Sequence, residues 1–485
     1  MTALARTPQA EQAQQRRWLV LAICCLSLLI VGVDTTIVNV ALPAIHRSLH
    51  ASLAGLQWTI DAYTLVIATL LMLSGSTADR VGRKPTFQVG LILFTAGSAA
   101  CAAAPNLGFL IGSRALQAIG GSMLNPVAMS IIRNVFHDPR ERAQAVGIWG
   151  AAMAVSMGLG PVLGGFLVDS VGWRYVFLVN VPIGLVACVL TALFVPNSRA
   201  ERPRRVDPVG QLLVIIGLAS LVYAIIEGQA DGWTSTLIVS LFIVAIVAFA
   251  ALVRYERRIA EPLLDFRFFR SAPFAGASAL AVCAFAAFGG FLFLNTLYLQ
   301  EVRKMSALHA GLCTLPTAAM MIVMAPLSGR MIAKRGARLP LLLSGVGMLL
   351  SPLLLTQLAP HTSLAVLIAS YVLFGLGLGT VNPPITNTAI SGMPPAQAGV
   401  AAALASTSRQ VGATLGIAVV GAVVGAGTVT GSFGAGFTSA THPGWWILVV
   451  LAVAILAIGV LTTTPWAHET AQRTSARLAS SEAGS

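Results

Sequence analysis

Three ionisable side chains lie deep inside apolar stretches of this sequence, where charged groups are rare. Asp34, Asp61 and Arg114 are each flanked on both sides by mostly apolar residues. Burial disfavours the charged form of a carboxylate, and a neighbouring arginine favours it again. A carboxylate balanced in this way can take up and release a proton, whereas arginine keeps its charge. We therefore expect Asp34 to carry a proton and Arg114 to tune it, unless the pair only holds helices together.

The composition predicts an all-α protein that crosses a membrane many times. Of 485 residues, 56% are hydrophobic and only 10% are charged. Apolar stretches of about 20 residues recur, and each is long enough to cross a hydrocarbon core of roughly 30 Å. We expect fourteen spans, at 18–40, 53–74, 86–104, 107–131, 144–168, 175–197, 208–229, 234–253, 274–299, 307–331, 338–358, 362–386, 399–425 and 444–464.

The distribution of positive charge indicates orientation rather than a nucleic-acid partner. The net charge is +13, and 24 of the 30 Lys and Arg residues fall on the side of the predicted spans that holds both termini. Four fall on the other side and two lie within spans. Cytoplasmic segments of membrane proteins are enriched in Lys and Arg. We therefore expect both termini in the cytoplasm.

The predicted spans place the three ionisable groups at similar depth. A helix rises 1.5 Å per residue, so Asp34 lies about 9 Å below the outer surface if its span ends near residue 40. The same arithmetic gives about 12 Å for Asp61 and about 10 Å for Arg114. We therefore expect one polar cluster, in which Asp61 carries a second proton or recognises a positive charge.

The sequence repeats itself at an offset near 254 residues. The spacing from Gly75 to Gly82 recurs from Gly329 to Gly336. Internal repeats of this kind are typical of secondary transporters, whose substrate path lies between the repeats. We expect a tail at 1–17, a six-helix bundle at 18–197, an inserted helix pair with basic flanking loops at 198–270, a second six-helix bundle at 271–466 and a tail at 467–485. We expect residues 1–15 and 467–485 to be disordered.

A charged hairpin between the second and third spans carries a family resemblance. The segment GSTADRVGRKP includes Gly75, Asp79, Arg80, Gly82, Arg83 and Lys84. It resembles the signature loop between helices 2 and 3 of the major facilitator superfamily of transporters. The resemblance implies two six-helix bundles that rock around a central cavity, with this loop as a cytoplasmic latch. It also implies that Asp79 contacts a helix N-terminus of the other half when the carrier faces outward.

Further motifs resemble the fourteen-helix drug:proton antiporters of the same superfamily. They are VDTTIVNVALPAI around Asp34, SRALQAIGGSMLNP at 113–126, WRYVFLVNVPIG at 173–184 and GLGPVLGG at 158–165, with Gly158, Gly160, Pro161, Gly164 and Gly165. The resemblance implies export of lipophilic, cationic or neutral drugs against inward protons. The glycines would allow close helix packing, and Pro161 would allow the helix to flex.

Polar residues for substrate contact are sparse in the spans. The candidates are Asn39, Tyr63, Asn295, Gln300, Arg409 and Gln410. No phosphate-binding loop of the G-x-x-x-x-G-K-[ST] type occurs, which argues against an ATP-driven pump. We expect no enzyme activity, no metal and no cofactor. The expected protein is a monomeric carrier in a bacterial inner membrane, and a dedicated exporter of one natural product or siderophore and a non-transporting sensor remain as alternatives.

Overall fold

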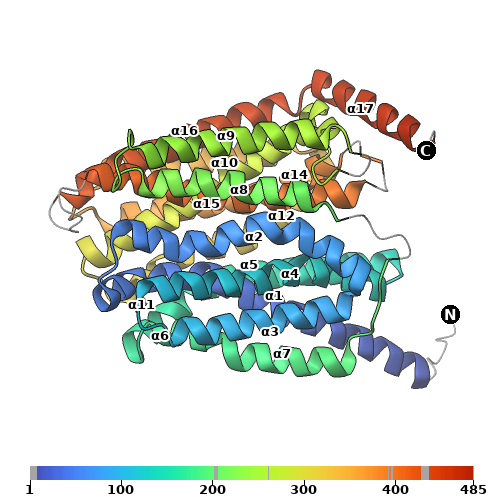
Figure 1. Cartoon of the computed structure of the whole chain (residues 1–485), viewed down its shortest axis with the longest axis horizontal. Helices are drawn as coiled ribbons and strands as arrows, with labels where there is room; N and C mark the ends of the chain where they lie inside the picture. The colour runs from blue at the N-terminus through green and yellow to red at the C-terminus, as the bar shows by residue number, and fades with distance from the viewer. Residues whose placement is uncertain are drawn as a thin grey trace.

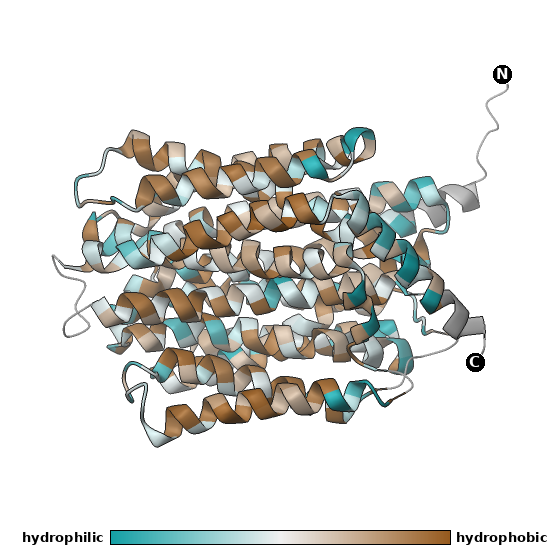
Figure 2. Ribbon diagram, turned by 90° about the horizontal axis from the view of Figure 1, so that it is seen from above, coloured by the Kyte–Doolittle hydropathy of each residue, from teal (hydrophilic) through white to brown (hydrophobic). Residues whose placement is uncertain are grey.

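The computed structural model of this chain is a bundle of long helices that lie side by side (Figure 1). It describes residues 8–200, 206–259, 262–391, 393–394, 397–427 and 436–483. Fourteen of the described helical segments are long and apolar enough to cross a membrane, which confirms the predicted number. Figure 2 shows hydrophobic residues along the bundle and hydrophilic residues concentrated toward its ends. The fold class predicted from the sequence is therefore confirmed.

The described part of the chain forms helices joined by turns and short connections. In chain order the helices are α1 (Pro8–Leu49), α2 (Leu53–Val81), α3 (Arg83–Ala102), α4 (Leu107–Val135), α5 (Pro139–Ser170), α6 (Arg174–Leu178), α7 (Asn180–Phe194), α8 (Pro208–Glu227), α9 (Thr236–Glu256), the 3-10 helix η1 (Phe266–Arg270), α10 (Ala272–Leu297), the π-helical η2 (Tyr298–Val302), α11 (Ala307–Cys313), α12 (Leu315–Arg335), α13 (Arg338–Leu355), α14 (Leu364–Ile390), α15 (Ala398–Gly427), α16 (Phe437–Leu461) and α17 (Pro465–Ala483). We call the end of the bundle where α1 begins the terminal end, and the opposite end the far end.

Local sequence explains where many of these helices begin. Side-chain oxygens of Ser52, Asn106, Asp207 and Ser235 accept hydrogen bonds from backbone N–H groups in the first turns of α2, α4, α8 and α9. Such caps satisfy donors that have no partner within the helix. Between the caps the residues are mostly apolar, and a helix in lipid pairs its own backbone groups. Capping and hydropathy together therefore define the spans.

Several boundaries differ from the sequence prediction. The helix that begins at Leu53 continues to Val81 instead of ending at residue 74, so most of the predicted charged loop is helical. The first helix continues to Leu49 instead of ending at residue 40, which places Asp34 about 22 Å from its end. The predicted disordered C-terminal tail is wrong for its described part, because α17 spans Pro465–Ala483. Hydropathy alone cannot locate these ends, since the helices continue past the apolar stretch into water.

The helices pack as two groups with an added pair. Helices α1–α7 pack on one another, as do α10–α16. Helix α8 packs against α2 of the first group and α15 of the second, and α9 packs on α8. Gln211 of α8 donates a hydrogen bond to the Thr69 carbonyl of α2 over 2.6 Å, and Trp58 of α2 donates one to Glu227 of α8 over 2.7 Å. The inserted pair therefore lies beside the seam between the two halves.

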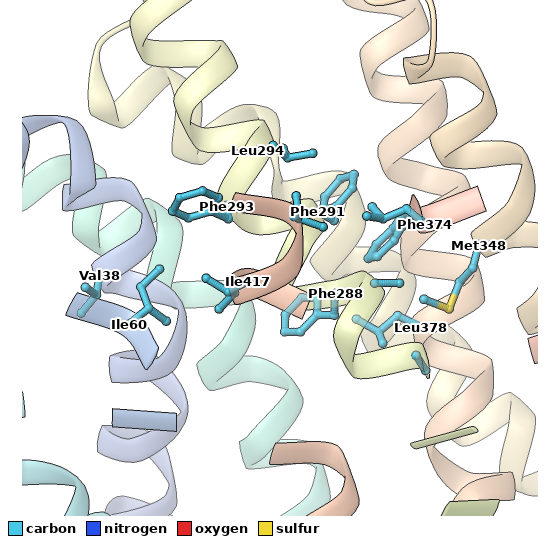
Figure 3. Close-up of a cluster of buried hydrophobic side chains, with 14 of the residues drawn as sticks. Val38, Ile60, Phe288, Phe291, Phe293, Leu294, Met348, Phe374, Leu378 and Ile417 are labelled. Carbon is cyan, nitrogen blue, oxygen red and sulfur yellow. The ribbon is translucent and has the colours of Figure 1, made fainter. Parts of the chain in front are cut away.

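A buried apolar cluster joins the two halves (Figure 3). It includes Val38 of α1 and Ile60 of α2 from the first half, and Ile417 of α15 from the second. In the second half the rings of Phe291 and Phe374 stack, with centroids 4.0 Å apart. This cluster fixes the helices that carry the polar residues described below.

The internal repeat is visible in the backbone. Gly82 separates α2 from α3 and has φ of +126°, and Gly336 follows α12 and has φ of +77°. Glycine adopts positive φ without the steric cost that other residues carry. The two glycines therefore make equivalent sharp turns at the terminal end of each half.

Candidate functional site

Asp34 of α1 and Arg114 of α4 form a buried ion pair. Arg114 Nη1 lies 2.6 Å from Asp34 Oδ2. The two residues are 0% and 1% exposed. The structure therefore brings together the predicted proton carrier and its predicted tuning charge.

Three N–H donors surround the Asp34 carboxylate. Besides Arg114, Gln117 Nε2 donates to Asp34 Oδ1 over 2.8 Å, and Asn180 Nδ2 donates to the same oxygen over 3.1 Å. Gln117 also donates to Ser98 Oγ of α3 and accepts a bond from Arg114 Nη1. The network ties four helices of the first half, α1, α3, α4 and α7, around one charge.

Besides Asp34, two aromatic rings and a backbone carbonyl contact the Arg114 guanidinium. Its guanidinium carbon lies 4.1 Å from the ring centre of Tyr63 and 5.6 Å from that of Phe177. Its Nε donates to the carbonyl oxygen of Thr59 over 3.1 Å. A cation over an aromatic face is attracted by the ring quadrupole. Tyr63, which the sequence suggested for substrate contact, is 1% exposed and instead packs on this arginine.

Asp61 does not join this network, so the predicted single cluster of three charges is wrong. The Tyr63 ring faces Arg114. Asp61 lies two residues earlier, on the opposite face of α2, because each residue turns the helix by about 100°. Asp61 Oδ1 accepts a bond from Thr64 Oγ1 over 3.3 Å, and Thr414 Oγ1 of α15 donates to Thr64 over 2.8 Å. Asp61 therefore faces the second half.

The Asp61 carboxylate is also incompletely satisfied. The side chain is 0% exposed, and its Oδ2 atom has no hydrogen-bond partner among the described residues. A buried charge without a full set of partners is costly. The depth estimate could not reveal this difference, because it gives position along a helix and not the direction of a side chain.

The charged hairpin is mostly helical, and only Gly82 separates α2 from α3. Asp79 and Arg83 form an ion pair across Gly82, with 3.6 Å between Oδ1 and Nη2. The segment after α7 packs on this turn, since Arg83 N donates to the Ser198 carbonyl over 2.8 Å and Lys84 Nζ donates to the Ala192 carbonyl over 2.8 Å. All these contacts lie within the first half. In this conformation the recorded partner of the Asp79 carboxylate is therefore Arg83.

The glycine motif of α5 lies between the two halves. A Cβ atom at Gly160 or Gly164 would collide with α1, at Thr36 and Ile37. One at Gly165 would collide with the backbone of α11 in the second half. Gly158 likewise faces α12, and the Pro161 carbonyl faces Gly311 of α11. The small residues thus let α5 lie tightly on its own half and on the other half at the same time.

Polar contacts close the far end of the bundle. Asp169, at the end of α5, accepts hydrogen bonds from Ala307 N over 3.1 Å and Leu308 N over 2.8 Å, which are the first amides of α11. Arg47 pairs with Glu301 at 2.9 Å. A carboxylate at a helix N-terminus is favourable. These contacts join α1 and α5 of the first half to α11 and η2 of the second.

The halves separate toward the terminal end. The Cβ positions of Gly147 and Gly150 in α5, and of Gly329 in α12, have no atom within 4 Å. Asn382 and Thr386, in the terminal half of α14, are exposed although they lie within a predicted span. The structure is therefore closed at the far end and open toward the terminal end.

The other predicted substrate residues fall into two groups. Asn39, Asn295 and Gln300 are 3%, 2% and 5% exposed in this conformation. Asn39 donates a hydrogen bond within its own helix, whereas Asn295 and Gln300 bond across helices. Gln300 Nε2, for example, donates to the Val40 carbonyl over 2.9 Å. Arg409 and Gln410 of α15 are half-buried and lie on the terminal side of the Thr64–Thr414 contact.

Sequence reasoning missed two residues that link helices at this site. Asn180 completes the Asp34 network, and Gln57 of α2 donates to the Ile417 and Ala418 carbonyls of α15 over 3.1 and 3.0 Å. Both are amides within apolar spans, and such side chains tend to bond across helices. That signal was present in the sequence, although it does not identify the partner.

Comparisons with known proteins agree with the fold and with the motifs. The family model for the Major Facilitator Superfamily matches residues 24–417. The chain is 38% identical over 401 residues, or 83% of its length and 74% of the relative, to the multidrug resistance protein Stp of Mycobacterium tuberculosis. It is 37% identical to the tetracenomycin C resistance and export protein of Streptomyces glaucescens, covering 87% and 78% of the two chains. It is 35% identical to the multidrug efflux pump LfrA of Mycolicibacterium smegmatis, covering 88% and 84%.

Solved structures share the architecture at lower identity. A bacterial homologue of the human lysosomal transporter Spinster, in an inward-facing and unoccupied conformation, matches with a TM-score of 0.65 and 20% identity, covering 98% of this chain and 99% of that chain. A POT family transporter in complex with 5-aminolevulinic acid matches with a TM-score of 0.68 and 15% identity, covering 92% and 96%. Together with the family match, the fourteen helices and the paired halves show that the chain belongs to the major facilitator superfamily.

Proposed function

We propose that this protein is a secondary active exporter that moves lipophilic drugs or antibiotics out of the cell while protons flow in. Relatives that are 38%, 37% and 35% identical to it over the matched residues are named as resistance, export and efflux proteins, which supports the class of cargo. The proton gradient would be the energy source, without a cofactor. The protein would act as a monomer in the inner membrane of a bacterium. Both termini would lie in the cytoplasm, as the distribution of Lys and Arg suggests.

The observation that carries proton coupling is the Asp34 network. The three groups that contact the carboxylate are all N–H donors, from Arg114, Gln117 and Asn180. A protonated carboxyl group must itself donate one hydrogen bond, and the three N–H groups that face it cannot accept one unless an amide turns its oxygen toward Asp34. Proton uptake therefore requires that part of the network opens. The protonation of Asp34 is in this way linked to the relative positions of α1, α4 and α7.

The same helix connects this network to the seam between the halves. Thr36, two residues after Asp34, donates a hydrogen bond to the Met157 carbonyl of α5 over 3.2 Å. Helix α5 in turn contacts the second half through Gly165 and Asp169. A shift of α1 on protonation would reach the far-end closure through α5. In the described conformation cargo would enter from the cytoplasm.

Ethidium transport in proteoliposomes tests this proposal. We expect transport under an imposed pH gradient that stops when nigericin collapses the gradient. Asp34→Asn should abolish gradient-driven transport, because the amide cannot carry the proton, while the protein still inserts into the membrane. Transport that continues after collapse, or that Asp34→Asn retains, would refute proton coupling through Asp34.

A dedicated exporter of one natural product is the second candidate. The relative from Streptomyces glaucescens is named for resistance to, and export of, a single compound. A panel of lipophilic drugs in the same assay separates the two candidates. Transport of several unrelated compounds supports multidrug export, whereas transport of one chemical family supports the dedicated exporter.

A further inference from the structure

Arg409 is a cationic side chain in the membrane helix α15. All of its recorded partners are neutral. Its Nη2 donates to Ser406 Oγ over 2.6 Å, and its Nη1 lies 3.4 Å from Asn382 Oδ1 and 3.5 Å from Thr386 Oγ1. No described carboxylate lies within ion-pair distance of it. Charged groups within membrane spans usually pair with an opposite charge or mark a ligand path.

The direction of Arg409 on α15 places it toward the centre of the bundle. Gly412 packs on α10, and Thr414 contacts α2 of the other half. Seen along the helix axis at about 100° per residue, the directions of Gly412 and Thr414 divide α15 into two sides, and Arg409 lies on one of them. The opposite side, with Val411 and Leu415, packs against the inserted pair. Arg409 therefore points between the two halves and not toward the inserted pair.

Arg409 also lies on the open side of the inter-half contact. It precedes Thr414 by five residues, which is about 7.5 Å toward the terminal end. Asn382 and Thr386 beside it are exposed. Asp61 lies on the other side of the Thr64–Thr414 contact, about 12 Å away along the axis, so it does not neutralise the guanidinium. A molecule that enters from the terminal end would meet a positive charge first.

We propose that Arg409, together with Asn382 and Thr386, binds an anionic group of the exported molecule. The preferred cargo would then be an amphipathic weak acid, with a carboxylate or phenolate attached to an apolar ring system, and a cation such as ethidium would be carried less well. This inference rests on the proposed export function. A guanidinium has five N–H donors and binds planar anions with two parallel hydrogen bonds. Two of its three recorded contacts are long, so donors remain for such a ligand.

Binding of three pyrene probes that differ only in charge tests the inference. Pyrenebutyrate is anionic, pyrenebutanol is neutral and pyrenebutylamine is cationic. Purified protein in phosphatidylcholine nanodiscs is titrated with each probe without any gradient, and signal from empty nanodiscs is subtracted. We expect the wild type to bind pyrenebutyrate more tightly than the alcohol, and the amine most weakly.

Two substitutions at Arg409 separate charge recognition from a structural role. Arg409→Gln should weaken pyrenebutyrate binding about tenfold or more, because it removes a charge-assisted contact in a site of low dielectric. The same change should leave pyrenebutanol nearly unchanged and strengthen pyrenebutylamine. Arg409→Lys, which keeps the charge, should keep the order of affinities. Arg473→Gln, on the exposed helix α17, removes one positive charge elsewhere and should change nothing.

Other outcomes would contradict either the inference or the proposed function on which it rests. Equal weakening of all three probes by Arg409→Gln indicates a structural role, and an unchanged order of affinities indicates that Arg409 does not select charge. Because no gradient is used, anion-selective binding without proton-driven transport would refute the proposed antiport and leave the binding site intact. Proton-driven transport with cation-selective binding would refute the binding site alone.

Discussion

At the scale of single residues, two buried aspartates in neighbouring helices have opposite environments. Asp34 accepts hydrogen bonds at both carboxylate oxygens and pairs with Arg114. Asp61 has one oxygen without a recorded partner and no recorded ion pair among the described residues. Removal of one partner of a buried ion pair leaves the other charge uncompensated, which is destabilising. A buried polar group that lacks a partner is itself costly. Substitution by asparagine should therefore act in opposite directions at the two positions.

We predict that Asp61→Asn raises the thermal unfolding midpoint of the purified protein in detergent, while gradient-driven export falls. The amide cannot ionise, so it removes the cost of burying a carboxyl group that has one oxygen without a partner, with a gain of about 1–3 kcal/mol. Asp34→Asn should lower the midpoint, because it leaves Arg114 buried without its counter-ion, at a cost of about 3–5 kcal/mol. Midpoint shifts of the same sign in the two variants would contradict this interpretation of the two environments.

At the scale of helices, the hairpin between α2 and α3 depends on one glycine. Gly82 has φ of +126°, and a Cβ atom there would lie 3.0 Å from Asn197 Oδ1. Gly75, in the same motif, lies inside α2, and the nearest atom to its Cβ position is 4.0 Å away. The motif thus contains one glycine that the backbone requires and one that the helix only accommodates.

We predict that Gly82→Ala lowers the free energy of unfolding by about 1–3 kcal/mol, since a side chain at this φ is strained. Gly75→Ala is the matched control and should be neutral or raise stability by up to about 1 kcal/mol, because alanine favours helix. Thermal unfolding of both variants in the same detergent gives the comparison. Equal destabilisation by the two changes would show that the turn does not impose this requirement.

At the scale of the whole molecule, one aspartate at each end of the bundle has partners of a different origin. At one end the partners belong to the other half, and at the other end the partner belongs to the same half. At the far end, Asp169 of the first half accepts hydrogen bonds from the first amides of α11 in the second half. At the terminal end, Asp79 pairs with Arg83 of its own half. The family resemblance predicts that Asp79 engages the second half when the carrier faces outward, and this stays a prediction. Carboxylates at helix N-termini would then hold each closed state in turn.

We predict that Asp169→Asn shifts the protein away from the far-end-closed conformation. The loss of charge at the start of α11 should cost about 0.3–1 kcal/mol, which corresponds to a shift of roughly two- to fivefold. A single cysteine introduced as Ala151→Cys, in the exposed terminal half of α5 and with the six native cysteines replaced, reports the change. Its labelling rate with a maleimide applied from the terminal side should fall, by at most that factor.

Arg47→Gln is the control for this experiment. Arg47 pairs with Glu301 at the same end, but its side chain is 60% exposed, and exposed ion pairs contribute little. It should leave the labelling rate nearly unchanged. An equal fall in both variants would mean that loss of any far-end charge loosens the closure, against a specific role for Asp169.

Sequence alone determined the class of the protein, the number of its membrane helices and the pairing of Asp34 with Arg114. Hydropathy and charge act locally, because every turn of a span must suit the lipid that surrounds it. The motifs around Gly82 and Gly160 were equally readable, since tight turns and close helix contacts restrict residue type at one position. The repeat offset correctly placed Gly336 at an equivalent turn.

Only the tertiary structure decided which way each polar side chain points and what it meets. Asp61 is not part of the predicted cluster, because it lies on the opposite face of α2. Tyr63 does not line the predicted cavity, because it packs on Arg114. Asn180 joined the site from a helix far away in the sequence. Residue spacing fixes height and angle within one helix, but partners on other helices depend on packing that no single span encodes.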